Sequence, residues 1–270
     1  MRTVLRRAVS NRTVFPHGRL AVLACIVALT PLHVIGAQDA ASVIQVAERD
    51  RTALNPAAAL ARYEAALATT TTNYDLLWRA AREATDLGES APDATKRTEF
   101  YHKAEGYARR AVTANANGAD GHFILAVTLG RTALTLGSRD RVRYAAEIHT
   151  EALAAVKLEP THAGALHVLG VWNAEIMRLG SFSRFAARNF LGGKVFDQAS
   201  WAEATRYMEA AVSADPGRVT HRLDLAKIYA ETDQQPKARS TCEAAGRMPT
   251  VEFNDARYKQ ECAALLAKLR

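Results

Sequence analysis

Small and apolar residues recur along this chain at spacings of three, four and seven, which place them on one face of an α-helix. The pattern Ala-x3-Tyr-x2-Ala begins at Ala59, and four related copies follow it. A fixed pattern of this kind indicates an array of helical repeats, in which small residues let neighbouring helices approach closely. The copies are Ala59, Tyr63 and Ala66; Ala104, Ala108 and Ala111; Ile148, Ala152 and Ala155; Ala204, Met208 and Ala211; and Ala238, Cys242 and Ala245.

A second pattern, a leucine with a small residue nearby, follows each of the first four copies at a steady offset. One helix carries the leucine pattern and the next carries the alanine pattern. Neither helix buries its apolar face alone, so neighbouring pairs must stack. The leucine pattern contains Leu77 with Ala80 and Ala81, Leu125 with Ala126, Leu166 and Leu169 with Gly170, and Leu225 with Ala226 and Tyr229.

Strand signals are almost absent, so the pattern predicts an all-α fold, a helical repeat array or α-solenoid with elongated helix pairs. Turn residues such as Asn73, Gly88 and the pair Asn117-Gly118 separate the helices. The expected helices are 39–50, 56–67, 74–87, 93–114, 119–136, 139–158, 161–179, 201–214, 218–231, 236–246 and 254–269.

These helix pairs resemble the tetratricopeptide repeat, whose Leu-Gly, Tyr, Ala and Pro positions are matched most fully over 163–248. Only the last interval between copies, from Ala211 to Ala245, has the usual repeat length. The first two intervals are about ten residues longer, roughly three helical turns shared by two helices. The interval from Ala155 to Ala211 contains an insertion, expected at 181–198.

Longer stretches resemble a particular family of tetratricopeptide proteins, the regulators of microtubule dynamics. The likeness covers roughly 72–270 and includes the long intervals and the insertion. It implies the fold and a generic scaffold role. The family takes its name from eukaryotic members associated with microtubules or organelle contacts, whereas the N-terminus of this chain is expected to direct export. The stretches are LLWRAAREATDLGE (76–89), ALHVLGVWNAEI (165–176), FLGGKVFDQASWAEATRYMEAAVSADPG (190–217) and LDLAKIYAETDQQPKA (223–238).

Residues 1–37 have the features of a secretory signal peptide: arginines without acids, an apolar core over 20–29, and a small residue, Ala37. Cleavage there predicts an exported protein, periplasmic or secreted. An uncleaved N-terminal membrane anchor is the alternative. The expected organisation is therefore 1–37 signal peptide, 38–72 N-terminal helices and 73–270 repeat domain.

The charge of the chain gives little support to nucleic-acid binding. The formal net charge is +7, but five of the 35 basic residues and none of the 28 acidic ones precede Gln38. The remainder has only a small basic excess, and no basic run is interleaved with aromatics. We therefore expect no nucleic-acid partner.

In tetratricopeptide arrays the first helix of each pair lines a concave groove, and the resemblance places eight residues there. They would form a mixed aromatic and basic groove suited to an extended or helical peptide. The alternative is that the long helices bury these residues against one another. The groove residues are Trp78, Phe123, His167 and Leu223, with Arg82, Val127, Val171 and Lys227 one turn further along.

The expected insertion holds four of the eight phenylalanines, interleaved with basic residues. One interpretation is a short amphipathic helix folded onto the array, with the Gly192-Gly193 turn returning the chain. The other is an exposed apolar patch for a partner or a membrane surface. The phenylalanines are Phe182, Phe185, Phe190 and Phe196.

Catalytic and metal motifs are missing from the sequence, and we expect neither an enzyme nor a cofactor. There is no HExxH, phosphate loop or GxSxG motif, and His162 and His167 are too poorly aligned on one helix to share a metal. Cys242 and Cys262 could form a disulfide or be two small core residues. The sequence thus predicts a non-catalytic scaffold or adaptor that binds a protein or peptide, with a membrane-associated protein as the alternative.

Overall fold

The computed structural model describes residues 32–190 and 194–269, and this part of the chain contains twelve α-helices, one short 3₁₀ helix and no strand. The helices are α1 (Leu32–Thr52), α2 (Pro56–Leu67), α3 (Tyr74–Ser90), α4 (Ala94–Ala114), α5 (Ala119–Ala133), α6 (Ser138–Leu158), α7 (Ala163–Arg178), α8 (Ser181–Phe190), η1 (Lys194–Gln198), α9 (Trp201–Ala214), α10 (Val219–Glu231), α11 (Gln235–Arg247) and α12 (Asp255–Lys268).

Several helix starts coincide with the local capping signals of the sequence. The side chains of Asn55, Asn73, Asp93 and Ser200 each accept a hydrogen bond from a backbone N–H in the first turn of the helix that follows. These bonds satisfy N–H groups that have no partner inside the helix. The expected starts of α2, α3 and α9 are therefore confirmed.

The sequence placed the end of α3 before Gly88, but the helix continues to Ser90. Gly88 is buried, and a Cβ there would lie 2.7 Å from the ring of Tyr101 on α4. This glycine therefore permits close helix packing instead of ending a helix. The leading helix is also longer than expected, since α1 begins at Leu32 and Ala37 lies inside it.

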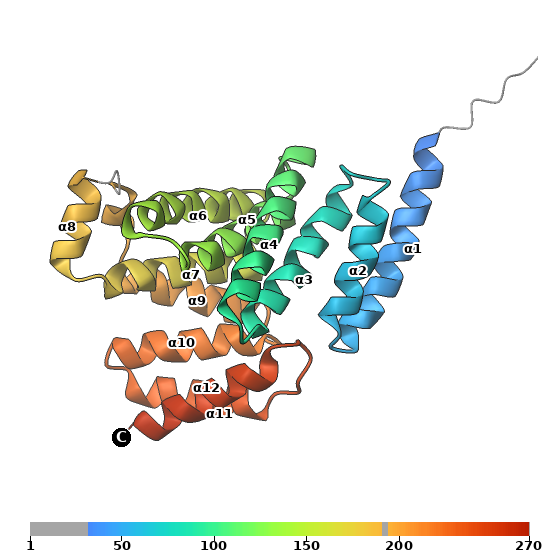
Figure 1. Cartoon of the computed structure of the whole chain (residues 1–270). Coiled ribbons are helices and arrows are strands. Elements are labelled where there is room, and N and C mark those ends of the chain that lie inside the picture. The colour runs from blue at the N-terminus through green and yellow to red at the C-terminus, as the bar shows by residue number, and fades with distance from the viewer. Residues whose placement is uncertain (1–31, 191–193, 270) are drawn as a thin grey trace, which may run out of the picture.

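The helices stack as pairs, α3 with α4, α5 with α6, α7 with α9, and α10 with α11 (Figure 1). The first helix of each pair carries the leucine pattern and the second carries the alanine pattern. Every residue of the five alanine-type copies is buried except Ala66 and Ile148, which are partly buried. The repeat register expected from the sequence is thus confirmed.

Gly170 shows why the leucine pattern includes a small residue. A Cβ at this position of α7 would lie 3.0 Å from Met208 Cε, 3.2 Å from the Met208 backbone nitrogen and 3.3 Å from the Ala204 carbonyl oxygen. The backbones of α7 and α9 therefore meet at this point, and a larger residue would push them apart.

The array curls so that α10, α11 and α12 lie beneath the earlier helices, and the segment between α11 and α12 reaches back toward α3 (Figure 1). Its Asn254 side chain donates to the Asp86 carbonyl oxygen on α3 at 3.5 Å. The insertion, α8 with η1, lies at the opposite side of the molecule from α1 (Figure 1). The curl encloses the concave side of the array.

Cys242 on α11 and Cys262 on α12 are free, buried thiols that contact one another within the C-terminal core. A hydrogen bond between the two thiols, together with burial, raises the pKa of Cys262. The structure therefore has the pair as small core residues and contains no disulfide between them.

Candidate functional site

The concave side of the array contains a cavity of about 400 Å³. It is lined by the first helices of the pairs, α3, α5, α7 and α10, and by residues of α12 and the segment before it. We call this cavity the groove. Trp78, Phe123 and Tyr258 supply aromatic side chains, and His162, His167 and His221 supply imidazoles.

Five of the eight residues that the repeat register places in the groove do line the cavity. Leu223 does not, because it is 1% exposed and belongs to the core formed with α11 and α12. On α10 it is Thr220 and His221 that line the cavity. Val171 packs against the core between α7 and α9, and Lys227 is paired with Asp224 and Glu261 outside the lining. The five residues that line it are Trp78, Arg82, Phe123, Val127 and His167.

The charge of the groove differs from the expected mixed aromatic and basic lining. Four arginines line the cavity, but so do seven carboxylates. The lining is thus more acidic than the mixed aromatic and basic groove expected from the sequence, because several of these acids come from helix ends and from the segment before α12, outside the repeat positions. The arginines are Arg51, Arg82, Arg131 and Arg218, and the acids are Asp86, Glu89, Asp120, Glu159, Asp215, Glu252 and Asp255.

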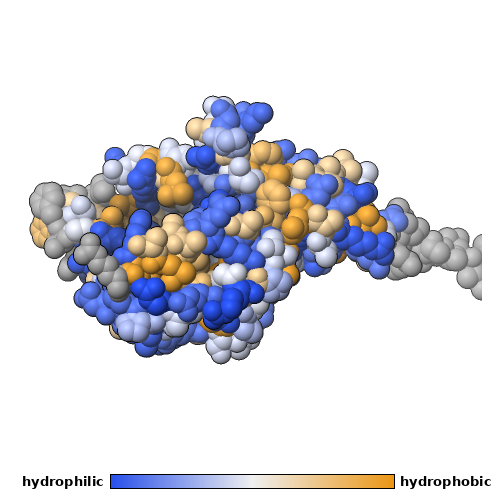
Figure 2. Space-filling view, turned by 90° about the horizontal axis from the view of Figure 1, so that it is seen from below, coloured by the Kyte–Doolittle hydropathy of each residue, from blue (hydrophilic) through white to orange (hydrophobic). Residues whose placement is uncertain are grey.

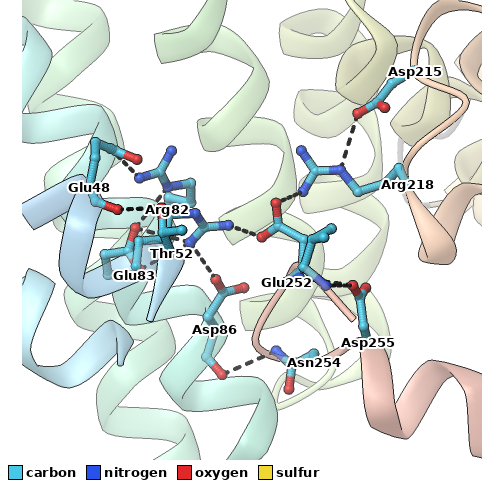
Figure 3. A network of polar contacts seen from close by, with 12 residues as sticks. Glu48, Thr52, Arg82, Glu83, Asp86, Asp215, Arg218, Glu252, Asn254 and Asp255 are labelled. Atoms are coloured by element: carbon cyan, nitrogen blue, oxygen red, sulfur yellow. Dashed lines mark hydrogen bonds and ion pairs between the residues drawn. The ribbon is translucent and has the colours of Figure 1, made fainter. Parts of the chain in front are cut away.

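Arg51, near the end of α1, is the centre of a charged network whose acids Glu83, Asp86 and Glu252 are labelled in Figure 3. Its Nη1 lies 3.0 Å from Glu83 Oε1 and 2.8 Å from Asp86 Oδ2, and its Nη2 donates to Glu252. Burial raises the pKa of both Glu83 and Asp86, although the charge of Arg51 opposes the shift. Arg51 therefore compensates carboxylates that would be costly to bury alone.

Glu252 connects this network to the C-terminal half of the chain. Besides Arg51, it pairs with Arg218, the residue before α10, whose Nη1 lies 2.8 Å from Glu252 Oε1 (Figure 3). A neighbouring set joins α3, α5 and α12, because Glu89 forms ion pairs with both Arg131 and Arg257. Helices from the beginning, middle and end of the array are thus held together around the groove.

Two of the groove histidines form a partly buried hydrogen-bonded chain with Asp224. The His167 and His221 Nδ1 atoms are 2.8 Å apart, and His167 Nε2 lies 3.3 Å from Asp224 Oδ2. If His167 donates from Nε2 to the carboxylate, its Nδ1 accepts from His221. Burial, followed by the neighbouring His167 and Arg218, lowers the pKa of His221 to about 2, so this imidazole is neutral.

Two polar atoms that belong to groove residues are buried without a hydrogen-bond partner among the described residues. One is Nε1 of Trp78, a donor, and the other is Oδ1 of Asp255, an acceptor. The Asp255 residue is 1% exposed, and its second oxygen accepts from the backbone N–H groups of Val251 and Glu252. Buried polar atoms of this kind usually have a partner, so both atoms suggest a contact that a ligand would complete.

The insertion does not present all four phenylalanines as one surface. Phe196 is 5% exposed and packs edge-on against Trp172, with ring centroids 6.1 Å apart. Phe185 is 57% exposed, and the side chains of Phe182 and Phe190 lie outside the described residues. The expected patch is therefore wrong for Phe196, which anchors the insertion to the array.

Separate hydrophobic patches, interleaved with hydrophilic residues, cover the face shown in Figure 2. Within 32–190 and 194–269, no helix combines the length and apolar character needed to cross a membrane. The same residues contain no group of three or more His, Cys, Asp or Glu side chains able to hold a metal ion.

Stacked helix pairs, small residues at the crossings and a groove lined by the first helix of each pair define a tetratricopeptide-type helical repeat protein. The family model for the regulator of microtubule dynamics proteins 1-3 matches residues 42–270, so the chain belongs to this family. The resemblance seen in the sequence is thus confirmed.

Similar proteins support this assignment at low sequence identity. The chain is 24% identical over 194 residues to regulator of microtubule dynamics protein 1 of Bos taurus, covering 71% of this chain and 61% of that protein. It is 23% identical to the protein 1 of Caenorhabditis elegans, covering 72% and 84%. A thermophilic tetratricopeptide protein of Thermus thermophilus shares the fold, with a TM-score of 0.60, 16% identity and coverage of 82% of this chain and 98% of that one.

The expected periplasmic or secreted location is wrong. The similar curated proteins are regulators of microtubule dynamics from eukaryotes such as cattle, mouse and a nematode. The expectation of a signal peptide or membrane anchor rested on residues 1–37, of which 1–31 lie outside the described residues and 32–37 belong to α1. The fold and the family support a protein-interaction scaffold.

Proposed function

We propose that this chain is a non-catalytic scaffold that binds a peptide segment of a partner protein in the groove. The observation that carries the proposal is the convergence of Trp78, Phe123 and Tyr258 with many hydrogen-bonding groups around one cavity. Aromatic side chains provide contact area, and polar groups fix the direction of a bound backbone. The unpartnered Nε1 of Trp78 would donate to a carbonyl oxygen of the peptide.

Removing groove residues is a poor test, because several of them also stabilise the fold. Arg82 pairs with Glu48 and with Glu83, whose side chain is fully buried. Trp78 packs against two core clusters. A substitution that fills the groove without breaking these contacts is a better test.

Thr220 is suitable for this purpose because it lines the cavity and occupies the first turn of α10. We expect Thr220→Trp to obstruct the groove while leaving the charged network in place. Thr95→Trp is the matched control, since Thr95 occupies the first turn of α4, is exposed and lies outside the lining.

The measurement is peptide selection from a random displayed library on the wild-type chain, followed by titration of the selected peptides. We expect the selected peptides to bind Thr95→Trp with the same affinity as wild type. Their affinity for Thr220→Trp should be at least about tenfold lower, a loss of about 1.4 kcal/mol of binding free energy. Equal binding to both variants, or a library with no enriched peptide, would contradict it.

A further inference from the structure

The net charge of the groove is opposite in sign to that of the chain. The chain carries a formal charge of +7, whereas seven acids and only four arginines line the cavity. The three groove histidines do not reverse this balance, because His221 is held neutral by burial and two protonated imidazoles would still leave the acids in excess. A cavity lined in this way attracts cationic groups.

Several of the acids are already compensated by the arginines of the chain. Asp86 and Glu252 contact Arg51, Glu89 contacts Arg131, and Asp215 contacts Arg218. These pairs also show that the groove accommodates guanidinium groups, since Arg51 is only 14% exposed at its side chain and touches three carboxylates.

Three groove acids have no lysine or arginine partner among the described residues: Asp120, Glu159 and Asp255. Asp120, at the start of α5, pairs with the His162 ring, whose Nε2 lies 3.4 Å from Asp120 Oδ1. Glu159 ends α6, and its backbone carbonyl oxygen accepts from the His162 N–H at 3.0 Å. Asp120 is therefore paired with the ring of His162, Glu159 is joined to the backbone of the same residue, and both acids line the cavity.

An aromatic surface lies beside these two acids. The His162 ring packs against Phe123 with centroids 4.8 Å apart, and Phe123 lines the cavity. The Phe123 ring also packs closely against Gly164, where a Cβ would come within 2.6 Å of it. Carboxylates next to an aromatic ring form a favourable site for a lysine or arginine side chain.

Asp255, which lines the same cavity, provides an independent observation. It is only 1% exposed, lines the cavity and has an Oδ1 without a hydrogen-bond donor in the described part of the chain. Burying an ionised carboxylate with an unused oxygen is costly unless a donor reaches it. A cationic ligand would supply that donor.

We propose that the groove recognises a basic peptide segment, with one lysine or arginine side chain held by Asp120 and Glu159 beside Phe123. A second cationic or N–H donor group of the same segment reaches Asp255. This inference rests on the proposed function, because it names the chemistry of the peptide that the groove binds.

The test uses three fluorescein-labelled synthetic peptides of equal length, made of Ala-Lys-Leu-Arg repeats, Ala-Gln-Leu-Gln repeats or Ala-Glu-Leu-Glu repeats. Each is titrated into the wild-type chain, into Asp120→Asn/Glu159→Gln and into Glu99→Gln/Glu243→Gln. The second pair is the control, because it removes the same charge from exposed positions outside the groove. Circular dichroism checks that both double variants remain folded.

Of the three peptides, the basic one should bind most tightly to wild type and to the control pair. Its affinity should decrease as the salt concentration rises. It should bind Asp120→Asn/Glu159→Gln about three- to tenfold more weakly. Tighter binding of the neutral or acidic peptide, or equal binding of the basic peptide to both double variants, would overturn the inference.

Thr220→Trp separates this inference from the proposed function. If the neutral or acidic peptide binds and Thr220→Trp blocks it, the groove binds peptides but does not select basic ones. If Thr220→Trp affects no peptide, or none binds, the proposed function fails and this inference fails with it.

Discussion

At the scale of single residues, His221 shows how burial in this fold changes the pKa of an ionisable side chain. It is 5% exposed, shares a hydrogen bond with His167 and lies near Arg218, which disfavours a positive charge. The pKa of His221 falls to about 2, far below the ordinary histidine value of 6.5. In the unfolded chain the same ring takes a proton near its ordinary pKa.

This difference predicts an acid-sensitive contribution to stability. Below the ordinary histidine pKa, the His221 imidazole is protonated in the unfolded state but stays neutral in the folded state. The free energy of unfolding therefore decreases as pH falls. The loss is at most about 1.4 kcal/mol per pH unit for one site. His221→Gln should therefore lose less stability than wild type between about pH 7 and about pH 5.

Urea unfolding at the two pH values measures this difference. His102→Gln provides the control, because His102 is an exposed residue of α4. If His221→Gln loses as much unfolding free energy between the two pH values as wild type and the control do, His221 is not the source of the acid sensitivity.

At the scale of elements, Phe196 packs the insertion between α7 and α9 against the rest of the array. Phe196 packs with Trp172, Ile176, Val142 and Ala187, while Phe185 projects from α8. The two phenylalanines are alike in size and lie in the same insertion, so they form a natural pair for mutation.

Phe196→Ala should destabilise the chain by about 3 kcal/mol, because it removes a large buried side chain and leaves a cavity. Phe185→Ala should change stability by less than about 0.5 kcal/mol. Thermal unfolding together with limited proteolysis within 181–198 tests both expectations. Similar stability losses in the two variants would mean that the insertion is not anchored by Phe196.

The elements themselves could largely be predicted from the sequence, because their periodicity and caps are local. The small residues of each copy, such as Ala204 and Ala211, identified the crossing faces. Which face of α10 lines the groove could not be predicted from the sequence. That face depends on α11 and α12, which pack against Leu223 and keep it in the core. Gly88 was misread for a similar reason: its role depends on Tyr101 of the next helix.

At the scale of the whole molecule, the groove is shaped by contacts between distant parts of the chain. Five groove positions followed from the repeat register, but the acids of the lining did not. Glu252 and Asp255 lie outside the repeat pattern and reach the groove only because the array curls. No spacing rule connects Arg51 to Glu252, so their contact could not be read from the sequence.

Glu252→Gln should weaken the link between the two ends by about 1–2 kcal/mol, because it removes one charged partner from both Arg51 and Arg218. We expect faster hydrogen exchange in the second half of α1 and in the segment 249–254 together. Glu243→Gln on α11, which is exposed, should change neither. Faster exchange confined to 249–254 would show that the contact does not couple the ends.

The link between Arg51 and Glu252 also has a consequence for the order of folding. The two residues are 201 positions apart in the chain. In an open array each repeat contacts only its neighbours, so repeats can form or melt successively from either end. Bringing two residues so far apart in the chain together costs conformational entropy. This cost is small only after the intervening helix pairs have stacked, because the stacking has already restricted the chain between them. Formation of the contact between Arg51 and Glu252 should therefore be the last step of folding. The contact also makes the stability of the first helix depend on the last repeat being folded.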